Sequence, residues 1–236
     1  MIIMKPVYIL LFISFFFSTE LFSQSGLGVM VDRAQQAFTD LANRSKRTPK
    51  PANIQGTHYF NERFEVATLD YFGTELNDKG FMRYNAFRDE VEMASTTSQN
   101  ESDLVLMKSN DIVPYIGGEK YLYIPHRLED GRAYIGYLVL LHEGNNHTVY
   151  IKRQKVFMEE VVARTGLENP FPPRFVDNIQ IYVSTKGDTP VPLKQSKKGV
   201  SSFFKENSDK VRKFIKANKL KVSETDAIIK VFEFAE

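Results

Sequence analysis

The sequence contains no cysteine and no tryptophan, and its formal net charge is only +2. The lack of cysteine excludes disulfide bonds, thiol nucleophiles and an anchor built on a lipid-modified cysteine. A chain without disulfides must be stabilised by its core, and about 200 residues suffice to bury roughly 70% of the unfolded surface. The small net charge gives no global argument for binding nucleic acid, so nucleic acid is not among the expected partners.

One long apolar run is present, at Val7–Phe17, with Lys5 before it and the more polar STELFSQ after it. This layout is typical of a secretory signal peptide, and the run is shorter than the about 20 residues that a membrane-spanning helix needs. We therefore predict a signal peptide over residues 1–24 and an exported protein, periplasmic or extracellular. An uncleaved anchor helix is the alternative, and no transmembrane segment is expected after cleavage.

The segment after the signal has helical periodicity. Its apolar residues recur in steps of three and four and share one helical face; they are Leu27, Met30, Val31, Ala34, Phe38 and Leu41. The basic, proline-bearing stretch at residues 44–51 disfavours helix. We predict an N-terminal helix and a tether over residues 25–53, followed by a single β-rich domain over residues 54–236.

Strand signals dominate from Ile54. Aromatic and β-branched residues fill THYFNERFEVATLDYFG, and a loop is expected at residues 75–80. Residues 81–93 are expected to be extended with a bend or bulge near Asn85. Pro114 indicates an edge strand. The runs KYLYIPHRL, AYIGYLVLL and TVYIKR, with Asp130-Gly131 between the first two, predict a three-stranded antiparallel meander.

The second half mixes strand and helix. VFMEEVVAR predicts two helical turns that end at Gly166, and Lys186-Gly187-Asp188 predicts another hairpin. The tail predicts helices over about residues 196–236, with a cap at Asn207 or Ser208 and a capping box at residues 223–226. The expected fold class is α+β: an antiparallel β-rich meander, as a curved sheet or half-barrel, with a short N-terminal helix and a C-terminal helical segment packed on the sheet.

Two histidines in LLHEGNNHTVY invite comparison with zinc proteases. His142 and His147 are five residues apart, which on a helix is about 140° from convergence, and Gly144-Asn145-Asn146 favours a turn. We predict a hairpin rather than a metal site, and no metal or cofactor is expected.

The acidic run DEVE, residues 89–92, lacks the glycine-punctuated spacing of a calcium loop. We interpret it as a solvated face paired with Arg83 or Arg88. No nucleophile elbow or phosphate loop is present, so no catalytic residue is assigned. Paired carboxylates from this region leave a hydrolase as an alternative.

Basic residues crowd the tail, and apolar residues are interleaved with them. The basic ones are Lys194, Lys197, Lys198, Lys205, Lys210, Arg212, Lys213, Lys216, Lys219 and Lys221. Such helices usually bury their apolar stripe and leave the lysines in water, and we favour this packing over a membrane or polyanion surface. Aromatic residues on the predicted strands, Tyr121 and Tyr123 among them, fit an ordinary sheet core or the lining of an apolar cavity.

Short motifs resemble those of an uncharacterised secreted family common in Bacteroidetes. They are Gly56-Thr57-x-Tyr59 with Phe64, then RYN at residues 83–85, DEVE at 89–92 and the tail KKGVSSFF through NKLKVSETDAIIKVFEF. The resemblance covers about residues 54–234, and implies a secreted or periplasmic location and no known activity. The candidate ligand-binding residues are Arg83, Tyr84, Asn85, Asp89, Glu90, Tyr121 and Tyr123.

The leading functional expectation is a non-enzymatic binding or adaptor protein, because the sequence carries no nucleophile, metal or cofactor signature. A carrier of a lipid or other apolar ligand in a half-barrel and a carboxylate-dependent hydrolase are the alternatives. The candidate partners are another envelope protein or an apolar ligand.

Overall fold

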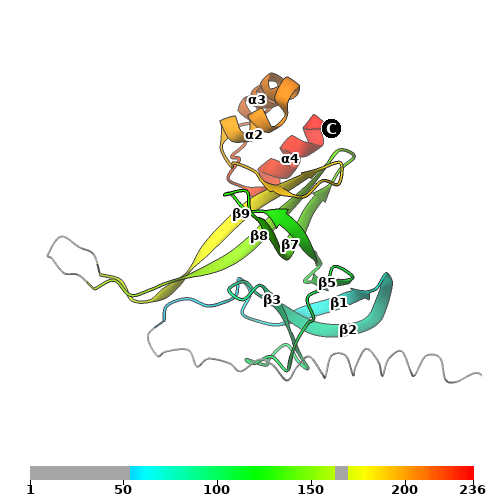
Figure 1. Cartoon of the computed structure of the whole chain (residues 1–236), viewed down its shortest axis with the longest axis vertical. Helices are drawn as coiled ribbons and strands as arrows, with labels where there is room; N and C mark the ends of the chain where they lie inside the picture. Colours follow the sequence, from blue (N-terminus) through cyan, green and yellow to red (C-terminus); the bar gives the residue numbers. More distant parts are fainter. Residues whose placement is uncertain (1–53, 163–169) are drawn as a thin grey trace, which may run out of the picture.

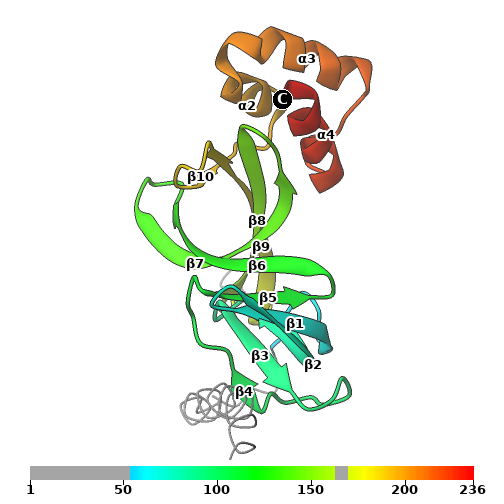
Figure 2. The same cartoon turned by 90° about the vertical axis from the view of Figure 1, so that its right-hand side faces the viewer.

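The computed structural model describes residues 54–162 and 170–236, so the predicted signal peptide, N-terminal helix and tether lie outside the described residues. The described chain is a curled antiparallel half-barrel with three α-helices at one end (Figures 1 and 2). The strand order is β10-β9-β8-β7-β6-β5-β1-β2-β3-β4. The strands are β1 Glu65–Tyr71, β2 Thr74–Asn85, β3 Glu90–Ala94, β4 Leu104–Val105, β5 Ile112–Ile116, β6 Glu119–Arg127, β7 Ala133–Glu143, β8 His147–Met158, β9 Arg174–Thr185 and β10 Val191–Pro192.

The first hairpin turns earlier than the sequence predicts. β1 and β2 are joined by Phe72 and Gly73, whose φ angles are 51° and 76°, and Tyr71 pairs with Thr74. Positive φ at both central residues suits a two-residue hairpin, although phenylalanine is an unusual residue there. The loop predicted at residues 75–80 is therefore wrong, since these residues belong to β2.

The second hairpin reverses the chain after Asn85, where a bend was expected. Asn85 pairs with Glu90, and residues 86–89 form the turn. This reversal places Arg83 directly opposite Glu92. Residues 81–93 are thus two paired strands and not one bent strand.

The predicted meander of three strands is confirmed as β6, β7 and β8. Pro114, however, does not mark an edge, because β5 lies between β1 and β6. Pro114 sits opposite Leu69 of β1, while the ladder between β5 and β6 contains only the pairs of Tyr115 and Ile116. A residue without an amide hydrogen is tolerated at this internal position because the second ladder is so short.

Strands β8 and β9 pair along their whole length and form a ribbon that projects from the body (Figure 1). Phe157 pairs with Phe175, and beyond the strands Val161 bridges to Phe171. The helix predicted from residue 156 is therefore wrong for residues 156–162, where aromatic and β-branched residues pair across strands instead. The rest of that prediction, including its end at Gly166, lies outside the described residues. The hairpin predicted around Lys186-Gly187-Asp188 joins β9 to β10 and is confirmed.

The sheet curls until the turn after β2 reaches β8. The amide of Lys155 donates to the carbonyl of Ala86 at 3.0 Å, and Ala86 is only 1% exposed. This contact joins the β1–β5 half of the sheet to the β6–β10 half, in addition to the two pairs between β5 and β6.

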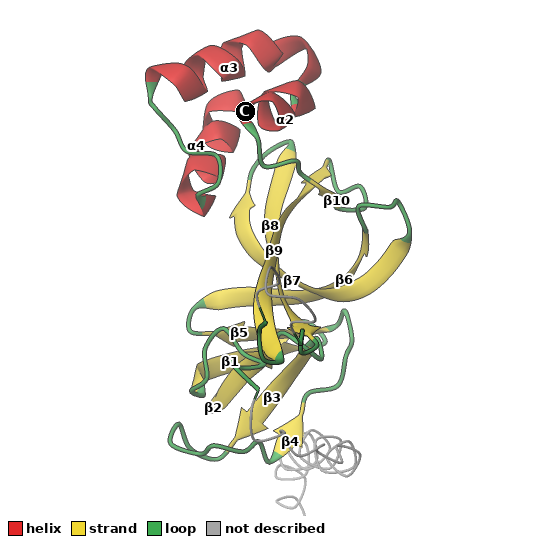
Figure 3. Ribbon diagram, turned by 90° about the vertical axis from the view of Figure 1, so that its left-hand side faces the viewer, coloured by secondary structure: helices red, strands yellow, loops and turns green. Residues whose placement is uncertain are grey.

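Three helices, α2 Lys197–Phe203, α3 Ser208–Ala217 and α4 Thr225–Ala235, lie beyond the end of the second half of the sheet (Figure 3). The rings of Phe203, Phe204 and Phe232 each lie 5.5 to 5.6 Å from the ring of His147, at the start of β8. α2 is capped by the Ser196 hydroxyl, which accepts from the amide of Gly199 at 3.0 Å. The predicted capping box is not formed, because Glu224 is the N-cap residue of α4 and its side chain makes no cap bond.

The basic helices bury an apolar stripe, as the sequence predicts. In α3, Val211 and Ile215 are buried, whereas Lys213 and Lys216 are exposed. Val211 and Ile215 belong to the same hydrophobic cluster as Val149 and Ile181 of the sheet. No helix in residues 54–162 or 170–236 is long and apolar enough to cross a membrane.

Candidate functional site

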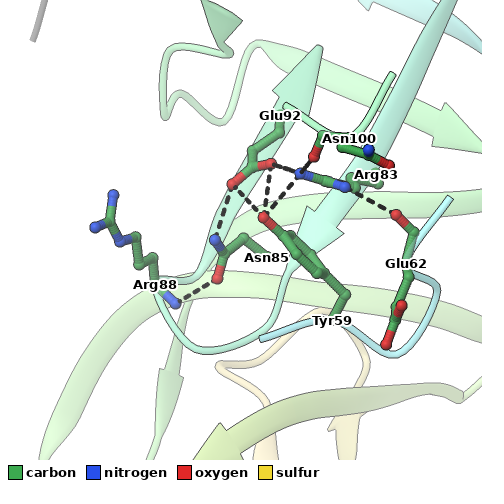
Figure 4. Close-up of polar contacts among 7 residues, drawn as sticks. All are labelled: Tyr59, Glu62, Arg83, Asn85, Arg88, Glu92 and Asn100. Carbon is green, nitrogen blue, oxygen red and sulfur yellow. Dashed lines mark hydrogen bonds and ion pairs between the residues drawn. The ribbon is translucent and has the colours of Figure 1, made fainter. Parts of the chain in front are cut away.

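A buried ion pair lies at the centre of the first half of the sheet (Figure 4). Arg83 on β2 and Glu92 on β3 are 4% and 6% exposed. The Nε and Nη2 atoms of Arg83 donate to Oε2 of Glu92 at 3.0 and 2.8 Å. A charge-assisted pair of this kind is strong only when the remaining polar atoms are also satisfied.

Arg83 also binds two other segments of the chain. Its Nη1 donates to the Glu62 carbonyl at 2.8 Å, and its Nη2 donates to the Tyr59 hydroxyl at 2.9 Å and the Asn100 carbonyl at 3.1 Å. The guanidinium carbon lies 3.9 Å from the centre of the Tyr59 ring and 4.2 Å from that of Phe64. One side chain therefore holds together the segment before β1, strand β2 and the loop after β3.

Glu92 is equally well satisfied. The Tyr59 hydroxyl donates to the carboxylate at 3.1 Å, and Asn85 Nδ2 donates to Oε1 at 2.9 Å. Asn85 Oδ1 in turn accepts from the amide of Arg88 at 3.0 Å. The predicted pairing of the acidic run with Arg83 is confirmed, but the predicted solvated face is wrong at Glu92 and at Asp89, which are only 6% and 9% exposed. We call Tyr59, Arg83, Asn85 and Glu92 the arginine network.

A polar groove opens directly above this network. It has a volume of about 740 Å³ and is lined by Thr57, Tyr59, Glu62, Arg63, Arg83, Thr97, Ser98, Gln99 and Asn100. Glu62, Arg63, Thr97 and Asn100 are exposed. Hydroxyl, amide, carboxylate and guanidinium groups thus face one cavity, and together they can donate and accept several hydrogen bonds.

A second buried pair lies where the two halves of the sheet meet. Asp89, at φ 55° in the turn after β2, places Oδ1 at 2.8 Å from Nζ of Lys152 on β8. Lys152 Nζ also donates to the Tyr137 carbonyl at 3.0 Å, and the Tyr84 hydroxyl donates to Asp89 Oδ1. Asp89 and Lys152 are 9% and 7% exposed, so the pair fixes the curl of the sheet from inside.

Burial and charge around the Asp89–Lys152 pair shift the pKa values of Lys152 and of two neighbouring tyrosines. Burial, then the charge of Asp89, raises the pKa of Tyr84 well above its ordinary value, and the same two causes raise the pKa of Tyr137. Burial lowers the pKa of Lys152, while the charge of Asp89 opposes that shift. The tyrosines therefore stay neutral hydrogen-bonding groups and not general bases at physiological pH.

The structure divides the candidate residues between two faces of β2. Arg83 and Asn85 point into the arginine network, whereas Tyr84 between them points to Asp89, as the two-residue period of a strand requires. The Tyr121 ring lies 5.4 Å from that of Tyr84, and the Tyr123 ring 5.1 Å from that of Tyr137. Glu90 belongs to neither cluster and lies 3.5 Å from Lys108.

Three residues of these clusters were missed from the sequence: Tyr59, Glu92 as a buried partner, and Lys152. Placing the hairpin turn at residues 86–89 would have aligned Arg83 with Glu92. Nothing local signals Lys152, because it meets Asp89 only through the curl of the sheet.

The hairpin of the two histidines is confirmed. His142 sits opposite Val149, and the His147 ring packs among phenylalanines. The turn between them is held by the Glu236 carboxylate, which accepts from the Asn145 amide at 2.9 Å. Within the described parts of the chain, no group of three histidine, aspartate or glutamate side chains is placed to hold a metal ion.

Comparison with protein families, curated proteins and solved structures found no match to this chain. The resemblance to a secreted Bacteroidetes family therefore stays a prediction. A function for the protein has to rest on the geometry of the groove and of the two buried ion pairs.

Proposed function

We propose that the protein is an exported, non-enzymatic binding module that holds a polar ligand in the groove above the arginine network. The observation that supports this proposal is the set of contacts made by the Arg83 guanidinium. Its guanidinium binds Glu92, Tyr59 and the carbonyls of Glu62 and Asn100, so it positions the groove walls. Buried charges with complete internal partners favour a rigid, preformed site over a reactive one.

The exposed wall favours an oligosaccharide as the ligand. Thr57, Thr97 and Ser98 bring hydroxyls, and Asn100 brings an amide, to one cavity, while the Gln99 amide binds the Thr96 amide and Asp103 and shapes the loop. Arg63 and Glu62 contribute one charge of each sign, so the groove does not select strongly for ionic ligands. A ligand rich in hydroxyl groups matches this mixture of donors and acceptors.

Two alternatives have less support. Contacts among Tyr84, Tyr121, Tyr123 and Tyr137 place aromatic rings against one another in the sheet, which favours a filled core over an apolar carrier. For a carboxylate hydrolase, Asp89 and Glu92 would have to be accessible, yet each is buried against a cation. Mass spectrometry of an organic extract of the natively purified protein tests the carrier: a lipid at near one per protein would favour it.

The test of the proposal is a glycan array and a peptide array probed with the mature chain, residues 25–236. Arg63→Ala removes an exposed groove side chain, and Arg132→Ala removes a matched exposed arginine that binds Asp130 in the turn between β6 and β7. We expect the mature chain to bind a glycan. The affinity should fall by at least about tenfold in Arg63→Ala and stay unchanged in Arg132→Ala. Binding confined to peptides would overturn the ligand class, and equal binding by both variants would overturn the groove.

A further inference from the structure

The far end of the β8–β9 ribbon exposes apolar side chains that the binding groove does not use. Val156, Phe157, Met158, Val161 and Val162 are 37 to 66% exposed. We call these five residues the ribbon tip. Exposed apolar residues gathered at one end of a ribbon can mark a surface that another segment or molecule covers.

The N-terminal part of the described chain starts beside this surface. The Gln55 amide donates to the Pro173 carbonyl at 2.9 Å, and the Phe175 amide donates to the Gln55 carbonyl at 3.0 Å, which forms a parallel bridge to Arg174. Arg174 is the cross-strand partner of Met158. The chain therefore enters the domain directly across β9 from the ribbon tip.

We propose that the segment over residues 27–41 docks on the ribbon tip through its apolar face. Leu27, Met30, Val31, Ala34, Phe38 and Leu41 share that face by helical spacing. A surface helix with such a face needs an apolar partner to be stable in water. As a helix the segment would be about 20 Å long, and the seven positions of Val156–Val162 would extend over a similar distance if fully extended, roughly 23 Å.

The length and the charge of the linking residues support docking of residues 27–41 on the ribbon tip. The linking residues 44–53 span at most about 35 Å when extended, which is enough to return from Gln55 to the ribbon tip. They carry Arg44, Lys46, Arg47 and Lys50, and the exposed acids Glu159 and Glu160 lie among the residues of the ribbon tip, between Met158 and Val161. The basic linking residues can therefore pair with acids at the ribbon tip.

The cysteine-free sequence permits a direct test in the mature chain. A single Val162→Cys substitution is labelled with a polarity-sensitive fluorophore, and the label is compared with one at Arg132→Cys, far from the ribbon tip. Docking predicts a blue-shifted emission at position 162 that moves to the red when Phe38→Ser and Leu41→Ser are added. The label at position 132 should not respond to these substitutions.

A second variant guards against a local effect of the label. If the acids attract the basic linking residues, the emission of a label at Met158→Cys should shift to the red as the salt concentration rises. Adding Glu159→Lys and Glu160→Lys should shift this emission to the red at low salt and remove its dependence on salt. Emission that is unchanged by the Phe38 and Leu41 substitutions would overturn the proposal. Emission that instead depends on protein concentration would also overturn it, because the ribbon tip would then be covered by a second copy.

Discussion

Arg83 and Glu92 face each other across the β2–β3 hairpin with 2.8 Å between Nη2 and Oε2. Burial of both charges costs desolvation energy, which is offset here by hydrogen bonds from Tyr59 and Asn85 and to two backbone carbonyls. Such a pair adds little net stability compared with apolar residues of the same size. Its contribution is to define where the walls of the groove lie.

Breaking the pair from one side should be severe. Glu92→Gln leaves the Arg83 guanidinium buried without its counter-charge, and we expect the free energy of unfolding to fall by about 3 to 5 kcal/mol. Denaturant unfolding measures the change. Arg212→Gln, which breaks the exposed pair with Asp209, is the control and should cost less than about 1 kcal/mol. Equal effects of the two variants would show that the Arg83–Glu92 pair is not a buried structural contact.

Gly136 on β7 should not tolerate a side chain. A Cβ there would lie 2.2 Å from Asp89 Oδ2 and 2.7 Å from the Tyr134 ring, and Asp89 could move away only by giving up its contacts with Lys152 and Tyr84. We expect Gly136→Ala to lower the free energy of unfolding by about 1 to 3 kcal/mol.

Gly80→Ala on β2 is the matched control for this prediction. The nearest atom to its added Cβ is Met82 Cε at 3.8 Å, so the substitution should be neutral or slightly stabilising. Thermal unfolding of both glycine variants measures the two changes. A Gly136→Ala protein as stable as Gly80→Ala would contradict the close approach of Asp89 to β7.

Stability should fall in mild acid because of His126. Its ring is fully buried against Tyr134 and Tyr182, and burial, then the charge of Lys152, lowers its pKa against the opposing effects of the Ile124 carbonyl and Asp89. The folded state therefore favours neutral His126. Its contribution is complete above the unfolded pKa of about 6.5 and is lost as the pH falls through the lower folded value.

The measurement is the free energy of unfolding between pH 7.5 and pH 5 for the native protein and for His126→Phe. Carboxylates contribute to the acid loss in both proteins, so the difference between their slopes isolates His126. The variant should show the shallower slope. Parallel curves would mean that His126 titrates alike in the folded and unfolded states.

The basic tail should behave as a packed structural unit. Ile215→Ala removes a side chain that is 1% exposed, and we expect a loss of about 2 to 5 kcal/mol. Lys213→Gln on the exposed side of the same helix should change stability by less than about 0.5 kcal/mol. Thermal unfolding of the two variants checks both, and a larger effect of Lys213→Gln would favour a role for the lysines in the fold.

Local patterns predicted the parts of this fold that depend on neighbours in sequence. The β6–β7–β8 meander followed from alternating apolar runs around Asp130-Gly131, and the buried stripe of α3 followed from its three- and four-residue spacing. The β1–β2 turn was missed because Phe72 adopts a positive φ that its side chain does not favour. The extension of β8 was missed because its partner, Phe175 on β9, lies well downstream.

The candidate site was predicted only in part for the same reason. Arg83, Tyr84, Asn85 and Asp89 were identified from one short stretch, but β2 sends Tyr84 to the face opposite Arg83 and Asn85, and Asp89 joins Tyr84 from the turn after β2. The partners that give each cluster its character come from distant segments: Tyr59 from the segment before β1, and Lys152 through the curl of the sheet. No local periodicity encodes that curl.

Calorimetric titration with the glycan that gives the strongest array signal measures binding in the groove directly. The native protein, Arg63→Ala and Arg132→Ala would be compared at equal folded concentration. We expect the affinity to fall by at least about tenfold in Arg63→Ala alone, with its unfolding midpoint unchanged. Unchanged affinity in Arg63→Ala, or release of a cleaved glycan that Glu92→Gln abolishes, would contradict a non-enzymatic binding groove.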